Sequence, residues 1–356
     1  NVDYPFNLTG ILFFPKLGNN INIEKDKIQL YQNQVFVTDE VKGIVPDFLT
    51  LLRGVIDSPD IPLNVSRSYL QADGAVKKIS TYITKKVADK MTSLIKENRE
   101  DYEKKWNDIK IVIEYGMISE EKFFEKSDKF ALYPTVDGQY LLWDELMEKI
   151  KPNQTDKDDK TIILYATDKD QQDSYISQAK AKGYEVLLLD SPIVPHLIQK
   201  LETSKDKISF ARVDADATSK LINKDEPIIA KLKDDEKKTV KKSIEEAIDD
   251  KAYNVQMEDL DSDETPFAIT NPEFMRRMKD MQMTGGGGMF GMGNFPEMYQ
   301  LVVNANSPLA ERILKEEDTE KRNEQIRQAL KLAKLSQNLL KGKELTDFVN
   351  KQFAKL

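Results

Sequence analysis

The sequence predicts a multi-domain protein that combines α/β and α+β folds: a middle region of two α/β subdomains, then an α+β domain ending in helices. The chain has 356 residues, which is more than one hydrophobic core usually serves. Apolar runs alternate with helical stretches over residues 161–214, as in parallel βαβ units. The chain ends in two helical stripes of apolar residues. We therefore expect domains over 1–150, 151–220 and 221–356.

The first domain is predicted to begin with strands. The segments LTGILFFP (8–15) and KIQLYQNQVFVT (27–38) are rich in β-forming residues and flank a polar turn. The next segment, PDFLTLLRGVID (46–57), predicts a helix that starts at Pro46. Its apolar residues fall on one helical face: Phe48, Leu49, Leu52 and Val55.

Three helices follow, at about residues 75–97, 99–116 and 119–130, the first with apolar residues every three or four positions. A polar linker, KPNQTDKDDK (151–160), precedes the strand–helix–strand pattern of the second domain. The third domain is predicted to contain a charged helix near 231–250, the short strand TPFAIT, and the helix NPEFMRRMKDMQM.

Composition excludes several classes of function. The net charge of −8 argues against nucleic-acid binding, which needs a basic surface for the phosphates. No apolar run is long enough to cross a bilayer. The chain has no cysteine, so zinc–thiolate sites and cysteine nucleophiles are excluded. The only histidine, His196, has no serine elbow beside it, and no metal site is predicted.

No phosphate-binding loop is predicted. Gly286, Gly288 and Gly291 match G-x-G-x-x-G, but a methionine-rich helix precedes them and a proline follows, so the strand and helix of a dinucleotide site are missing. The acidic string MEDLDSDET (257–265) lacks the glycine and closing glutamate of a calcium loop.

A methionine- and glycine-rich stretch is a candidate contact surface. Seven of the 11 methionines lie between Met275 and Met298, with six of the 15 glycines. Methionine is flexible and polarizable, which suits surfaces that fit unrelated apolar partners. The alternatives are a disordered loop or a helix packed inward. The candidate contacts are Met278, Met281, Met289, Phe290 and Met292.

The last two helices are candidates for subunit contact. Two short amphipathic helices at a chain end cannot bury their apolar stripes alone, so we expect a second subunit to cover them. The alternative is that they pack on their own domain. The apolar positions are Ile326, Leu330, Ala333, Leu340, Leu345, Phe348, Val349 and Phe353.

The segment DIPLNVSRSYLQ (60–71) breaks the helical pattern around it and contains Arg67. One interpretation is a structural ion pair. The other is an arginine finger, whose planar charge stabilises a transferring phosphoryl group. A finger needs a nucleotide pocket opposite, which this chain lacks. Because the chain begins at Asn1 within a strand-rich segment, we expect it to be cut from a longer protein.

Four segments resemble the ninety-kilodalton heat-shock chaperones, of the bacterial type. They are VDYPFNLTGILFFP, the stretch from KIQLYQNQVFVT to NVSRSYLQ, GYEVLLLDSPI and YQLVVNANSPLAERI, and the similarity extends over nearly the whole chain. The resemblance implies that the chain holds the middle and C-terminal domains, without the N-terminal ATP-binding domain. It implies that Arg67 contacts the ATP γ-phosphate, with Asn64 and Gln71 in the same catalytic loop. A glutamate commonly follows the arginine in the family, whereas Ser68 follows it here.

The resemblance also implies the cofactor and partners. ATP with Mg²⁺ would bind to the missing domain of a cytoplasmic homodimer, and this chain alone would not hydrolyse ATP. Partly folded client proteins would contact the methionine-rich stretch, and the last two helices would form the dimer. Two rival functions are a passive dimeric scaffold and a stand-alone α/β enzyme that binds a small molecule.

Overall fold

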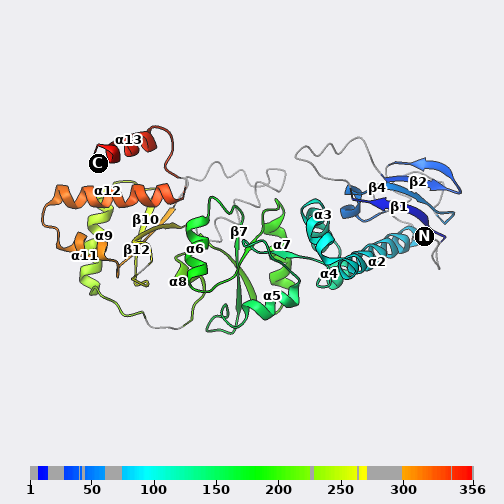
Figure 1. Ribbon diagram of the computed structural model, residues 1–356, viewed down its shortest axis with the longest axis horizontal. Coiled ribbons are helices and arrows are strands. Elements are labelled where there is room, and N and C mark those ends of the chain that lie inside the picture. Colours follow the sequence, from blue (N-terminus) through cyan, green and yellow to red (C-terminus); the bar gives the residue numbers. More distant parts are fainter. Residues whose placement is uncertain are drawn as a thin grey trace. The chain divides into compact units, whose positions relative to one another are not determined.

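The computed structural model divides the chain into two compact units (Figure 1), each described by itself. Unit 1 consists of Asn1–Tyr133, Tyr140–Leu146 and Ser191–Ser204, and unit 2 of Pro134–Gln139, Met147–Asp190 and Lys205–Leu356. The structure describes residues 7–14, 28–39, 41, 45–60, 74–224, 228–262, 264–270, 299–337 and 339–354.

Unit 1 begins with a four-stranded sheet in the order β1-β4-β2-β3. Strand β1 (Thr9–Phe13) is antiparallel to β4 (Arg53–Asp57), and β4 is parallel to β2 (Ile28–Gln32). Strand β3 (Val35–Thr38) forms a hairpin with β2, within the segment that the sequence predicts to be β-rich. The hairpin turn needs positive φ at two polar residues, Asn33 at 49° and Gln34 at 67°.

The prediction of a helix over residues 46–57 is wrong. Only a short 3₁₀ helix, η1 (Asp47–Leu51), follows Pro46, and the chain then becomes extended as β4. Gly54 explains the change, because its φ of +141° is incompatible with a helix and it lies against β1. Val55 consequently pairs with Ile11 and is 40% exposed, while Phe48 and Leu49 are buried.

Three helices complete most of unit 1, close to their predicted positions: α2 (Gly74–Glu97), α3 (Arg99–Ser119) and α4 (Glu121–Ser127). Asn98 caps α3 by accepting a hydrogen bond from the Asp101 amide at 3.0 Å. A ring cluster fills the core, with Phe123 at 4.7 Å from Phe48 and 5.1 Å from Phe130 between centroids. In Figure 1 the long helix α2 runs beside the sheet.

The short strands β5 (Tyr133–Pro134) and β6 (Tyr140–Leu141) and helix α5 (Trp143–Ile150) lie where the ranges of the two units alternate. Helix α7 (Val194–Ser204) belongs to unit 1 and contacts α3.

Unit 2 contains the predicted parallel sheet, in the order β8-β7-β9. Its strands are β7 (Thr161–Ala166), β8 (Val186–Leu188) and β9 (Ile208–Arg212). All six residues of β7 are buried, which is why its sequence is apolar without alternation. Helices α6 (Asp173–Ala181) and α8 (Thr218–Leu221) accompany the sheet.

A second sheet follows in unit 2, in the order β10-β12-β11. Strand β12 (Tyr299–Asn304) is parallel to β10 (Tyr253–Glu258) and antiparallel to β11 (Phe267–Thr270). Among the described residues, the helices that accompany this sheet are α9 (Asp234–Ile248), α11 (Pro308–Lys315), α12 (Thr319–Ser336) and α13 (Gly342–Phe353).

The two sheets of unit 2 share apolar contacts. Ala217, which follows β9, clusters with Leu260, Ala268 and Val302 of the second sheet's region. The predicted mixture of α/β and α+β folds is confirmed, whereas the three-part division at residues 150 and 220 stays a prediction.

Candidate functional site

The predicted catalytic loop lies outside the described residues, so Asn64, Arg67 and Gln71 have no structural description. The chain that leads into it is well anchored. Ser58 is fully buried, and its amide donates to the Tyr31 carbonyl at 3.1 Å. Asp60 accepts a hydrogen bond from the Asn7 amide at 3.1 Å. The described chain after β4 is therefore held by hydrogen bonds at Ser58 and Asp60.

The predicted contact residues of the methionine-rich stretch also lie outside the described residues. They are Met278, Met281, Met289, Phe290 and Met292. The chain enters this stretch from β11 and leaves it into β12, and these two strands pair with each other in the second sheet.

The predicted dimerisation residues divide into buried and exposed groups. Ile326, Ala333, Leu340 and Phe348 are at most 6% exposed in a single chain. Ile326 and Ala333 belong to the core formed with α9 and the second sheet, and Leu330 packs against it. Leu345 is half-buried. Val349 and Phe353 remain 38% and 68% exposed.

Two further apolar residues on α12 are exposed, Leu332 at 51% and Leu335 at 40%. At 3.6 residues per turn, Leu335 lies on the side of the helix opposite to Ile326 and Ala333, and Leu332 lies next to Leu335, about a third of a turn from Ile326. The sequence indicates these exposed residues, because the end of α12 carries apolar residues on more than one face. Only one face of a helix can pack on the core. Lys334 links α12 to α13 through Glu344, at 2.7 and 2.9 Å.

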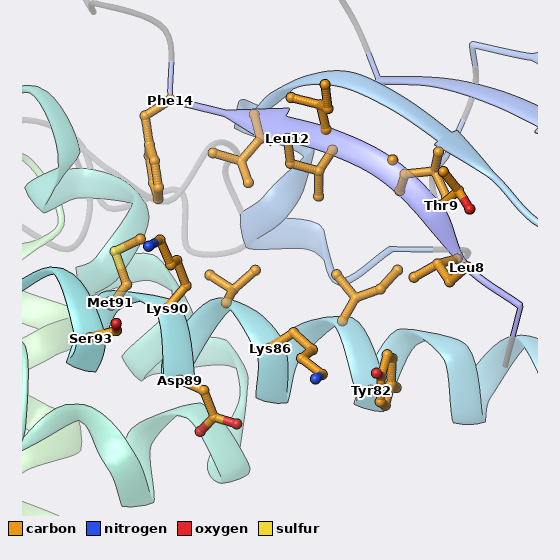
Figure 2. A pocket seen from close by; sticks show the side chains of 16 residues that line it. Leu8, Thr9, Leu12, Phe14, Tyr82, Lys86, Asp89, Lys90, Met91 and Ser93 are labelled. Carbon is orange, nitrogen blue, oxygen red and sulfur yellow. The ribbon is translucent and has the colours of Figure 1, made fainter. Parts of the chain in front are cut away.

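An apolar groove lies in unit 1 between β1 and α2 (Figure 2). Its volume is about 590 Å³. Leu12 and Phe14 extend toward α2, and Lys86 and Lys90 lie on the helix side. No single position in the sequence identifies this groove, because it depends on how a strand and a helix about 70 residues apart pack together.

A polar crevice lies in unit 2 where β7 and β9 end, with a volume of about 360 Å³. Thr270 is 1% exposed there, and its hydroxyl has no hydrogen-bond partner among the described residues. The Tyr175 hydroxyl donates to the Ile269 carbonyl at 2.9 Å, and burial raises the tyrosine's pKa, so it stays a neutral donor. Gln337 of α12 donates to the same carbonyl at 2.6 Å.

Among the described residues, no group of three carboxylate or histidine side chains is placed to hold a metal ion. The helices described are all too short or too polar to cross a membrane. His196 lies in the first turn of α7 and is half-buried.

Apolar side chains are exposed on both units, among them Ile11 and Val35 in unit 1 and Leu332 and Phe353 in unit 2. Comparison with known proteins shows that residues 1–355 match the family described as Hsp90 protein. The chaperone protein HtpG of Porphyromonas gingivalis is 51% identical over 317 residues, which cover 88% of this chain and 46% of the relative.

Two other relatives extend the comparison. The HtpG of Bacteroides thetaiotaomicron is 50% identical over 321 residues, or 89% of this chain and 47% of that protein. An endoplasmin homolog of Dictyostelium discoideum is 31% identical over 252 residues, or 68% of this chain and 32% of that protein. The chain belongs to the Hsp90 family of chaperones, as its resemblance predicts. It spans about half the length of the curated HtpG relatives it matches.

Proposed function

We propose that this chain forms the middle and C-terminal domains of an ATP-driven, homodimeric, cytoplasmic chaperone that binds partly folded client proteins. The supporting observation is the family match over residues 1–355, together with sequence identities of 51% and 50% to two HtpG chaperones. ATP and Mg²⁺ would bind to the protein's own N-terminal domain, outside this chain. Nucleotide binding would favour a closed state of the dimer, and hydrolysis would let it reopen.

In this proposal Arg67 completes the ATPase site. Its guanidinium would contact the γ-phosphate when the N-terminal domain docks, and a planar charge there stabilises the phosphoryl group in the transition state. Asn64 and Gln71 would position the same loop. The anchored residues Ser58 and Asp60 support this role, because a finger acts best from a fixed base.

Client contact is assigned to the methionine-rich stretch, at Met278, Met281, Met289, Phe290 and Met292. Partly folded proteins expose apolar side chains of varied shape, and flexible thioether side chains adapt to them. The strands β11 and β12 would hold the two ends of the stretch close together.

Dimerisation is assigned to α12 and α13. Ile326 and Ala333 fix α12 on the unit's own core, which leaves Leu332, Leu335 and Phe353 as apolar surface that a second copy can cover. The Lys334–Glu344 ion pair and the 2.8 Å contact between Lys351 and Glu324 hold the two helices together as one surface.

The chaperone role is tested by refolding a chemically denatured reporter enzyme with the full-length protein, with and without ATP. We expect a higher yield with ATP. Met278→Ser combined with Met281→Ser should reduce the yield, while the matched polar change Gln282→Ser should leave it unchanged. A yield that does not depend on ATP would favour the passive scaffold. Tight binding of a small molecule by this chain alone would favour the stand-alone enzyme.

A further inference from the structure

The polar crevice of unit 2 lies at the carboxyl ends of two parallel strands. Thr167 and Asp168 directly follow β7, Arg212 is the last residue of β9, and all three line the crevice. In the order β8-β7-β9 the chain passes from β7 to β8 on one side and then crosses to β9 on the other. Open α/β sheets bind ligands where the strand order changes direction in this way, outside the carboxyl ends of the strands. The crevice therefore occupies the position at which this topology forms ligand sites.

One buried hydroxyl group in the crevice is left without a hydrogen bond. Thr270 ends β11, is 1% exposed and lines the crevice, and its Oγ1 has no partner among the described residues. Buried hydroxyl groups in native proteins are normally paired, because an unpaired one costs stability. The volume of about 360 Å³ is far more than one water molecule needs and is enough for a small ligand. The unpaired hydroxyl group therefore indicates that a bound molecule completes the site.

The loop between β7 and α6 is not arranged to hold an anion. The Asp168 Oδ1 accepts the N–H groups of Asp170 and Gln171, each at 3.0 Å. The Gln172 Oε1 accepts the N–H groups of Thr167 and Asp168, at 2.8 and 3.1 Å. Loop amides of this kind bind phosphate in other α/β folds, but here the loop's own side chains already pair them. A phosphate or carboxylate ligand is therefore disfavoured.

The charges that line the crevice are unequal. Among the described residues of the lining, the charged side chains are Asp168, Arg212 and Asp214. Arg212 and Asp214 form a two-point ion pair at 2.5 and 2.8 Å, so their charges offset each other. Within the part of the chain that the structure describes, Asp168 forms no ion pair, and its Oδ2 is left as an acceptor. The lining therefore carries an excess of negative charge.

A second acceptor and an apolar surface complete the lining. Gln337, which follows α12, donates the N–H groups of its amide to the Tyr175 hydroxyl and the Ile269 carbonyl, so its Oε1 is left as an acceptor. Tyr299 and Leu339 add an aromatic and an aliphatic side chain. A ligand that matches this lining donates hydrogen bonds, carries positive charge and has a short hydrocarbon chain.

We propose that this crevice binds a small aliphatic amine in its protonated form. The ammonium groups donate to the acceptors of the lining, Asp168, Thr270 and Gln337, and the methylene chain lies against Tyr299 and Leu339. The bound amine joins the loop after β7 to the end of β11, and so links the two sheets of unit 2. The site needs neither ATP nor a client protein, so it goes beyond the proposed function.

The test is isothermal titration calorimetry of the 356-residue chain with 1,4-diaminobutane. An ionic strength of about 0.15 M screens the diffuse attraction between a cation and a chain of net charge −8. We expect saturable binding with a Kd of about 1 mM, because so small a ligand makes few contacts. This affinity is far below the tight binding expected of the stand-alone enzyme. The uncharged 1,4-butanediol has the same chain length and should bind about tenfold more weakly or less.

Two aspartate variants separate the crevice from the general acidity of the chain. Asp168→Asn keeps Oδ1 for the loop amides but removes the charge, and it should weaken diamine binding about tenfold. Asp170→Asn is the matched control, because it makes the same change of net charge at an exposed position of the same loop, outside the lining. This control should bind within about twofold of the unchanged chain.

A third variant tests the unpaired hydroxyl group. Thr270→Val keeps the shape of the side chain, and it should weaken diamine binding about threefold or more. The chain without diamine should keep its thermal stability, because the hydroxyl group makes no hydrogen bond there. The proposal is overturned by the absence of saturable binding, by equal binding of the diol, by equal losses in the two aspartate variants, or by unchanged affinity of Thr270→Val. Far-UV circular dichroism of each variant confirms that the fold is retained.

Discussion

Gly54 is the residue on which the pairing of β1 with β4 depends most directly. An added Cβ would lie 1.9 Å from the Ile11 carbonyl oxygen, a backbone atom that cannot rotate away. The φ of +141° is also a conformation that residues with side chains rarely adopt. We predict that Gly54→Ala separates β1 from β4 and destabilises unit 1.

The magnitude follows from these two effects. A residue held in a sparsely populated backbone region costs about 1–3 kcal/mol, and forcing an extra carbon into a filled space costs about 1–3 kcal/mol more. The sum is roughly 4 kcal/mol, a large part of the stability of an ordinary domain. With a urea dependence of about 2 kcal/mol per molar, the unfolding midpoint of unit 1 should fall by about 2 M.

The assay is intrinsic fluorescence during urea unfolding. The chain has two tryptophans, and Trp106 and Trp143 are both buried in unit 1, so the signal reports that unit. Gly342→Ala is the matched control, because Gly342 has φ +56° with no atom within 4 Å of an added Cβ. That change should cost only about 1 kcal/mol, read by circular dichroism. The reasoning is refuted if Gly54→Ala costs no more than Gly342→Ala.

Two other predictions concern the dimer and acid stability. Replacing Leu332 and Leu335 by aspartate should convert the proposed dimer to monomers in sedimentation equilibrium, with unchanged folding. Ile326→Ala should instead cost about 2–5 kcal/mol of stability, because it opens a cavity in the core. Hydrogen bonds from Arg99, at 2.5 and 2.8 Å, lower the pKa of the Glu145 carboxyl from its ordinary 4.5. A lowered folded pKa stabilises above the unfolded value, and the contribution is lost as pH falls through the folded value. Glu145→Gln should therefore cost about 1 kcal/mol at neutral pH, since the pair is partly exposed, and reduce the loss of stability between about pH 5 and pH 3.

Each of these two predictions would be contradicted by a specific result. A dimer that survives both aspartates would place the subunit contact elsewhere. An equally steep acid transition in Glu145→Gln, followed by tryptophan fluorescence, would mean that other carboxylates control the acid stability of unit 1.

Elements with a strong local pattern were predictable. The parallel strands β7, β8 and β9 are apolar because they are buried, and α2 shows a repeating apolar stripe. The apolar pattern over residues 46–57 led to a wrong helix prediction. Phe48 is buried as part of a 3₁₀ helix and Leu52 as an extended residue, so the two do not share one helix face. Strands β10 and β12 were missed because each depends on a partner far along the chain.

The candidate functional residues were predictable only in part. Arg67 alone permits an ion pair or a finger, and the family resemblance favours the finger. The apolar residues of α12 and α13 were visible as stripes, but only the fold separates Ile326, which serves the core, from Val349, which stays exposed. The groove beside β1 depends on tertiary packing and had no signal in the sequence.

The most direct test of the central claim is the rate of ATP hydrolysis by the full-length protein, with Arg67 intact and as Arg67→Ala. Nucleotide affinity and dimer mass are measured in parallel, and Arg312→Ala, at an exposed position on α11, is the matched control. If Arg67 completes a split ATPase site, turnover falls by roughly a thousandfold in Arg67→Ala, with unchanged ATP binding, and is unaffected in the control. Unchanged turnover in Arg67→Ala would show that this arginine only braces its own domain, and would contradict the ATPase role proposed for this chain.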